Sequence, residues 1–244
     1  MSLNACAALV ERSDPDRFRA TMAAPVAARR VLFPIYAFNV EVTRAPWVTQ
    51  EAMIAEMRLQ WWRDALEEIG AGGTVRKHEV VDALADVIDP EATKTLDDLI
   101  AARRWDVYSD AFEDRTHLNE YIDATSGALM WTAARLLGGT DEAGVRTFAY
   151  GVGIANLLRA VPDLEDRGRK PLVDGTVSGV KALAQDGLTS LRHGNAPKAV
   201  KLSGFQAALI LKQAIADPSR VSNGTLGLGP LRQTTCLARI ALLG

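Results

Sequence analysis

The sequence predicts an all-α domain, and three observations favour this fold class. Apolar residues recur at steps of three and four along most of the chain, which is the spacing of one face of a helix. Alternating apolar and polar runs, which are typical of half-buried strands, are nearly absent. The 244 residues, 48 % of them hydrophobic and 24 % charged, match an ordinary globular composition and are enough for one domain, 1–244, with a sizeable core.

The apolar spacing and the turn residues between periodic runs predict about eight to ten helices joined by short connectors. In chain order they are Val26–Thr43, Thr49–Ile69, His78–Ile88, Glu91–Ser109, Thr116–Leu137, Asp141–Val161, Val177–Arg192, Pro197–Ala216 and Leu231–Leu243. The longest irregular pieces are Pro162–Thr176 and Pro218–Pro230, and neither is long or polar enough for a domain linker.

Two of these helices carry specific expectations about their ends and faces. Thr116 is expected to cap its helix, which ends at Gly138-Gly139 after one apolar stripe. In the helix capped by Thr49, a repeat of four is expected to mark the buried side. The residues of that repeat are Met53, Met57, Trp61, Ala65 and Ile69.

The segment around Gly151 and Gly153 imitates the start of a dinucleotide fingerprint. It has no third glycine and no preceding strand, so close packing of two helices is the favoured interpretation. Pro162 is expected to end the helix that contains these glycines, because proline lacks an N–H donor.

Composition excludes several classes of protein. The net charge of -2 argues against a nucleic-acid binder, and two cysteines argue against a disulfide framework and for a reducing compartment. Three scattered histidines make a histidine-rich metal site improbable. We find no spanning segment and no signal peptide, and we therefore expect a cytoplasmic protein, with peripheral contact at the inner membrane left open.

Three motifs follow one another along the chain: Tyr36-Ala37-Phe38, the Arg-Leu-Gln-Trp-Trp-Arg run at 58–63, and Gly168-Arg169 followed by Leu172. In this order they resemble the squalene/phytoene synthase family, and the resemblance runs from about residue 15 to about residue 240. The resemblance implies an isoprenoid synthase fold, a helical bundle around a central cavity. In that family two facing helices each carry aspartates four residues apart, which hold Mg²⁺ against the substrate diphosphate.

The aspartate positions implied by the resemblance hold other residues here. They fall on Thr43 and Trp47 in the first motif and on Ala160 and Leu164 in the second, and Arg44 adds a positive charge. Loss of both motifs predicts a catalytically degenerate protein with no catalytic residue, no metal site and no cofactor. Mg²⁺ would enter only if displaced carboxylates such as Glu41, Asp163 and Asp166 replaced the lost ones.

The same departures occur in a branch of the superfamily, the mitochondrial complex I assembly factors (Sicily type). The chain is similar to this branch at Ala37–Glu41, Met57–Trp62 and Leu158–Pro162. This resemblance implies an assembly or scaffold role with respiratory-complex subunits or assembly proteins as partners. Two alternatives are an active prenyl-diphosphate transferase and a prenyl-lipid binding protein.

Polar and aromatic residues within these motifs are candidates for lining a retained pocket. They are Asn39, Glu41, Arg44, Arg58, Trp61, Tyr121, Asn156 and Arg159. For several of them a purely structural interpretation is equally good or better. Asn39 and Glu41 suit a pocket or a hydrogen-bonded pair, and Asn156 is favoured as an interhelical hydrogen bond.

The arginines and tryptophans in these segments also have two interpretations. Pairing of Arg63 with Glu67 is favoured over anion binding, whereas Arg159 is expected to meet a buried partner or a ligand. Trp61, Trp62 and Trp131 are more often core residues than the lining of a prenyl slot. A further basic cluster, Arg167, Arg169 and Lys170, suits a flap, a contact to acidic lipid or, as the favoured interpretation, a solvated loop.

Overall fold

The computed structural model describes residues 2–49, 51–108 and 110–243, and these residues form helices with no strand among them. The all-α prediction is confirmed for these residues. The longer helices are α1 (Ser2–Ser13), α2 (Pro15–Ala23), α3 (Val26–Arg44), α4 (Ala52–Gly70), α6 (Pro90–Arg103), α8 (Ala128–Leu136), α9 (Glu142–Asp166), α10 (Val177–His193), α12 (Ala207–Ala216) and α14 (Pro230–Leu243). The shorter ones are η1 (Ala45–Trp47), α5 (Glu79–Ala85), η2 (Arg104–Val107), α7 (Arg115–Ile122), η3 (Asp123–Gly127), α11 (Lys198–Lys201), η4 (Leu202–Gly204) and α13 (Ser219–Ser222).

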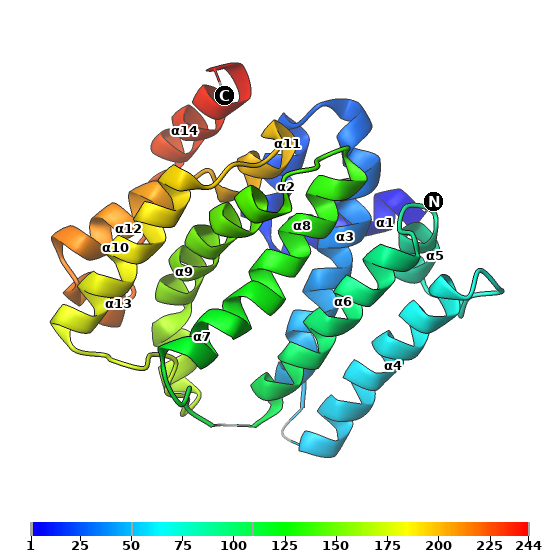
Figure 1. The fold of residues 1–244 in the computed structure, drawn as a ribbon, viewed down its shortest axis with the longest axis horizontal. Helices are drawn as coiled ribbons and strands as arrows, with labels where there is room; N and C mark the ends of the chain where they lie inside the picture. Colours follow the sequence, from blue (N-terminus) through cyan, green and yellow to red (C-terminus); the bar gives the residue numbers. More distant parts are fainter. Residues whose placement is uncertain (1, 50, 109, 244) are drawn as a thin grey trace.

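Helix α9 lies in the middle of the bundle and packs against α8 and α10 (Figure 1). Gly151 permits the close approach to α10, because a Cβ atom there would lie 2.5 Å from the carbonyl oxygen of Gly187 and 2.5 Å from Cγ of Leu191. The interpretation of Gly151 and Gly153 as packing residues is therefore confirmed.

The stripe expected between residues 116 and 137 is buried, but the helix is not continuous in its geometry. Leu118, Ile122 and Leu129 are in the core, and a π-helical segment, η3, separates α7 from α8. The N-cap is Asp114, whose carboxylate accepts the His117 N–H at 2.9 Å, so the expected Thr116 cap is wrong. The end at Gly138 is confirmed, since this glycine has φ +87°.

The buried face of α4 differs from the prediction. Met53 and Met57 are 75 % and 66 % exposed, whereas Leu59, Trp62 and Leu66 are buried. A repeat of four drifts by about 40° per step around a helix of 3.6 residues per turn, so the expected stripe leaves the core side. Thr49 does not cap α4, because its hydroxyl accepts the N–H of Glu51, which is itself the N-cap residue.

The expected helix end at Pro162 is wrong, because α9 continues to Asp166. Proline removes the one donor that would bond to the Leu158 carbonyl. Leu158 and Val161 are fully buried, and their packing offsets that loss. The continuation matters because it carries residues 163 and 164 on the helix and not in a loop.

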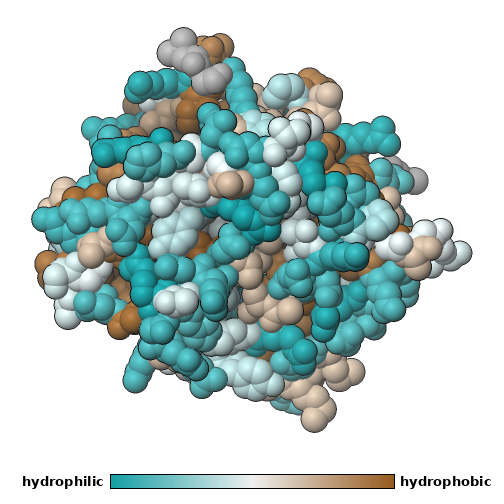
Figure 2. Space-filling model, in the orientation of Figure 1, coloured by the Kyte–Doolittle hydropathy of each residue, from teal (hydrophilic) through white to brown (hydrophobic). Residues whose placement is uncertain are grey.

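Two helices, α1 and α2, precede the first helix that the sequence predicted, and α13 interrupts the segment expected to be irregular. Ser109, the expected end of one helix, lies outside the described residues. Hydrophilic residues predominate on the face seen in Figure 2, and hydrophobic residues appear there as smaller patches. Within the described ranges, every helix is too short or too polar to cross a bilayer.

Candidate functional site

A cavity of about 790 Å³ lies between α3 and the C-terminal half of α9. Residues of η1, η2, η3 and the α1–α2 junction complete its wall, and the segment after α9 closes one side. This volume is in the range of pockets that hold small molecules. The wall mixes apolar side chains with charged ones.

The α3 side of the pocket presents Asn39, Thr43 and Arg44, followed by Trp47 from η1. Asn39 is only 7 % exposed, and its amide makes no hydrogen bond within the described residues. The Thr43 hydroxyl is also buried without a partner there. Because buried polar groups are normally paired, these two groups face the cavity with unused hydrogen-bonding capacity.

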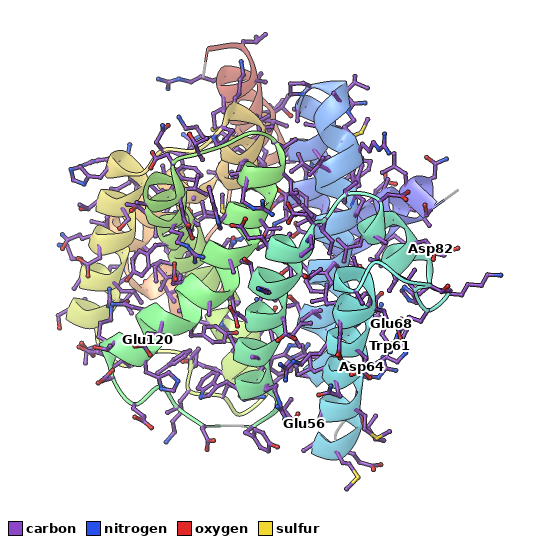
Figure 3. The ribbon with its side chains drawn as sticks, turned by 45° about the vertical axis from the view of Figure 1, so that its right-hand side comes forward. Glu56, Trp61, Asp64, Glu68, Asp82 and Glu120 are labelled. Atoms are coloured by element: carbon purple, nitrogen blue, oxygen red, sulfur yellow. The ribbon has the colours of Figure 1, made fainter. Side chains whose placement is uncertain are left out.

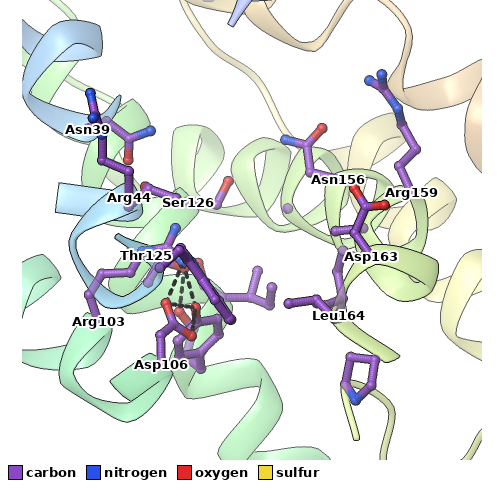
Figure 4. A pocket seen from close by; sticks show the side chains of 18 of the residues that line it. Asn39, Arg44, Arg103, Asp106, Thr125, Ser126, Asn156, Arg159, Asp163 and Leu164 are labelled. Atoms are coloured by element: carbon purple, nitrogen blue, oxygen red, sulfur yellow. Dashed lines mark hydrogen bonds and ion pairs between the residues drawn. The ribbon is translucent and has the colours of Figure 1, made fainter. Parts of the chain in front are cut away.

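The α9 side presents Asn156, Ala160, Asp163 and Leu164 (Figure 4). Arg159, on the same helix, reaches Asp16 of α2 at 3.1 Å. Arg159 was expected to meet a buried partner or a ligand; the structure gives it a carboxylate partner, but Arg159 is exposed, so a buried pair is not observed. Asn156 lines the cavity and makes no interhelical hydrogen bond within the described ranges, so the favoured interpretation of this residue is not the one observed.

All four positions to which the family resemblance assigns aspartates line this cavity. Thr43 and Trp47 lie on one side, and Ala160 and Leu164 lie on the other. The arrangement depends on the continuation of α9 through Pro162, because Leu164 would otherwise leave the helix face.

A buried network forms the wall near η2. Arg103 donates to Asp106 at 3.0 Å and to the Tyr121 hydroxyl at 2.6 Å, and that hydroxyl donates to Asp106 at 2.8 Å (Figure 4). Burial raises the pKa of Tyr121 far above its usual range; Arg103 opposes this shift, and the Asp106 carboxylate adds to it. The phenol therefore stays protonated and serves as a donor to Asp106.

A second group of cations lies at the mouth of the cavity and is called here the cationic mouth: Arg44, Arg167, Arg169 and Lys170. The guanidinium carbons of Arg167 and Arg169 each lie 4.9 Å from the centroid of the Trp47 ring. Arg169 also donates to the carbonyl oxygens of Asp106 and Tyr108. These contacts tie the segment after α9, expected to be a solvated loop, to η1 and η2.

The charges around the cavity are unequal. Seven lining residues are basic and four are acidic, although the whole chain carries a net charge of -2. Four of the lining cations form ion pairs: Arg17 with Asp14, Arg44 with Glu41, Arg103 with Asp106 and Arg159 with Asp16. Within the described residues, the other three, Arg167, Arg169 and Lys170, have no carboxylate partner.

Four of the candidate residues lie away from the cavity. Glu41 pairs with Arg44 at 3.5 Å, and Arg58 is exposed on α4. Trp61 packs on Trp62 and His78, on the side of α4 that also carries Asp64 and Glu68 (Figure 3). Asp166 is exposed and outside the lining, so Glu41, Asp163 and Asp166 do not meet in one place.

The remaining tryptophan and arginine interpretations are also decided by contacts. Trp62 and Trp131 are buried core residues, as favoured. Arg63 pairs with Asp97 of α6 at 2.6 Å, and the expected pairing with Glu67 is wrong. In the part of the chain that the structure describes, no three histidine, cysteine or acidic residues gather as a metal site.

Sequence reasoning missed Arg103, Asp106 and Arg17 as lining residues. Arg17 and its partner Asp14 lie at the start of a helix that was not predicted, and Tyr121, which bonds to both Arg103 and Asp106, is distant in the sequence. One signal was available: Arg103 and Asp106 are three residues apart, which places an ion pair on one helical face.

Comparisons with known proteins give the family and confirm the expected isoprenoid synthase-type bundle. A sequence model described as squalene/phytoene synthase matches residues 10–173. The chain belongs to the squalene/phytoene synthase family. The structure is also similar to the crystal structure of a dehydrosqualene synthase in complex with ligand, with a TM-score of 0.74 at 14 % identity, over 98 % of this chain and 95 % of that one.

Curated relatives include proteins named complex I assembly factor 6. The Drosophila melanogaster homolog of this factor is 28 % identical over 198 residues, which cover 74 % of this chain and 57 % of that protein. The Bos taurus protein is 25 % identical over 226 residues, covering 86 % and 64 %. The aligned regions span from about half to two thirds of the length of these relatives.

Proposed function

We propose that this chain is a non-catalytic member of the squalene/phytoene synthase family that assists the assembly of respiratory NADH:quinone oxidoreductase. The observation that carries the proposal is the set of residues facing the cavity at the four positions of the family's aspartates. Thr43, Trp47, Ala160 and Leu164 bring one hydroxyl and three apolar side chains. The names of the curated relatives support the assembly role.

An active synthase of this family must stabilise the charge of the leaving diphosphate. Mg²⁺ takes oxygen ligands and is usually held by one or two carboxylates together with substrate phosphates. Asp163 is the one lining carboxylate without an ion-pair partner in the described ranges, and Arg44 places a positive charge on the opposite side. Loss of transition-state charge stabilisation of about 3 kcal/mol already costs about a hundredfold in rate.

Turnover tests the non-catalytic half of this proposal. Purified full chain is incubated with farnesyl or geranylgeranyl diphosphate and Mg²⁺, with an active dehydrosqualene synthase as positive control. The expected result is diphosphate release no faster than with heat-denatured protein. Release above that background, abolished in Asp163→Asn, would instead establish an active transferase that uses this remaining carboxylate.

Gene deletion tests the assembly half. We expect loss of assembled NADH:quinone oxidoreductase with unchanged carotenoid and squalene content, restored by the intact gene. An unchanged respiratory complex together with altered isoprenoids would contradict the proposal.

A further inference from the structure

We infer that the cavity binds an amphiphile with a phosphate head, and that the cationic mouth holds this head without a divalent metal. The inference rests on the proposed function in one respect, because it assigns the pocket to binding and not to turnover. The observation behind it is the balance of charge around the cavity: the four aspartate positions of the family hold no carboxylate here, whereas Arg44, Arg167, Arg169 and Lys170 line the same cavity.

Three guanidinium groups and one ammonium group surround the mouth. Only Arg44 has a carboxylate partner within the described residues, at 3.5 Å, and Arg44 is half exposed. Like charges gathered without counter-ions repel one another, and a bound anion removes that repulsion. The charge of the mouth therefore matches a phosphate, whose oxygens accept the paired donors of arginine.

The mouth is also held in place before any ligand binds. The Trp47 ring contacts both Arg167 and Arg169, and cation–π contacts of this kind fix the guanidinium groups. Two backbone carbonyl oxygens, of Asp106 and Tyr108, take further donors of Arg169. An anion site assembled in this way loses little conformational freedom on binding, which favours affinity.

Deeper in the pocket the wall suits an apolar tail that carries a polar group near the head. Val40, Ile122, Leu129 and Leu157 line this part. The Asn39 amide faces the pocket without a partner in the described residues although it is nearly buried, and it offers a hydrogen bond to a ligand oxygen (Figure 4). The combination of apolar wall and cationic mouth favours an amphiphile over a free anion.

Calorimetric titration of the full chain with farnesyl monophosphate tests the inference. The titration is run in EDTA and again in Mg²⁺, and inorganic phosphate and farnesol are titrated separately. We expect the same dissociation constant with and without Mg²⁺, and much weaker binding of phosphate or farnesol alone. Charge-assisted hydrogen bonds predict that Arg44→Gln and Arg167→Gln each weaken binding by about tenfold or more.

Arg58→Gln is the matched control, because Arg58 is an exposed arginine outside the cavity, and its binding should equal that of the unchanged protein. Circular dichroism of each variant checks that the fold is retained. Binding that requires Mg²⁺, equal binding of inorganic phosphate, or no loss in both mouth variants would overturn the inference. Absence of any binding would overturn it as well, yet would leave the proposed function intact, whereas turnover of prenyl diphosphates would defeat the proposed function itself.

Discussion

Two parts of the pocket wall hold their charges in different ways. Near η2, Arg103, Asp106 and Tyr121 satisfy one another, and their side chains are largely buried. At the cationic mouth, Arg167, Arg169 and Lys170 have no carboxylate partner within the described residues. The first group therefore stabilises the fold, whereas the second leaves positive charge that an anionic ligand can neutralise.

The largest expected effect is on the paired side. Asp106→Ala leaves Arg103 without its carboxylate and the Tyr121 hydroxyl without its acceptor, so we expect the free energy of unfolding to fall by about 3 kcal/mol. Urea denaturation followed by circular dichroism measures it. The matched variant Asp163→Ala removes an exposed carboxylate without an ion-pair partner in the described ranges and should change stability by less than about 0.5 kcal/mol. An equal loss of stability in Asp106→Ala and Asp163→Ala would contradict the structural role assigned to the paired carboxylate.

The next largest loss of stability is expected in α9, the helix that lines the cavity opposite α3. In Gly151→Ala the new methyl group meets the Gly187 carbonyl and Leu191 at 2.5 Å, and we expect a loss of about 1–3 kcal/mol. Gly175→Ala is the control, because no atom lies within 4 Å of its Cβ position. If both variants unfold at the same urea concentration, the tight α9–α10 contact is not required.

A smaller effect is expected from the proton of Tyr121. Its pKa is raised in the folded state, mainly by burial, so the stability it contributes is full below the unfolded tyrosine pKa of about 10 and is lost as pH rises above that value. Tyr121→Phe should lower stability by about 1 kcal/mol near neutral pH. The difference between unchanged protein and variant should stay constant from about pH 7 to pH 9 and shrink above about pH 10.

The stability of Tyr121→Phe is compared with that of the unchanged protein at each pH, because other groups titrate in the same alkaline range. Burial raises the pKa of Cys6 to about 11 and also raises that of Tyr36. A difference that stays constant through pH 11 would contradict the assignment to Tyr121.

The smallest effect is expected at the mouth. Lys170→Gln removes one of several like charges without breaking an ion pair in the described part of the chain, so the free energy of unfolding should change by less than about 0.5 kcal/mol. Any increase in the free energy of unfolding should be visible at low salt and vanish at high salt, because salt screens the repulsion between exposed charges. A clear loss of stability at both salt concentrations would mean that Lys170 has a structural partner.

The sequence predicted what depends on local spacing. The stripe from Leu118 to Leu129 and the close packing at Gly151 follow from helical periodicity and from the size of glycine. Pro162 misled the prediction because buried neighbours keep α9 helical beyond it. The α4 stripe failed because a strict repeat of four winds around the helix.

The pocket was predicted only in part. Three of its four ion pairs join residues three apart, whereas Arg159 meets Asp16 at a separation that no helical period encodes. Outside the pocket, Arg63 meets Asp97 of another helix in the same way. Asn39, Asn156 and the four former aspartate positions were found because a motif resemblance placed them. Asp106 belongs to no motif, and only the three-dimensional arrangement brings it to Tyr121.

The central claim is that cations of this chain, and not metal-binding carboxylates, face the head of the ligand. The most direct measurement is a crystal structure with farnesyl monophosphate and Mn²⁺, using anomalous diffraction to locate the metal. The account predicts a phosphate contacted by Arg44 and Arg167, with no Mn²⁺ held by protein carboxylates between α3 and α9. Mn²⁺ bound there by Asp163 and a second carboxylate, bridging to the phosphate, would contradict it.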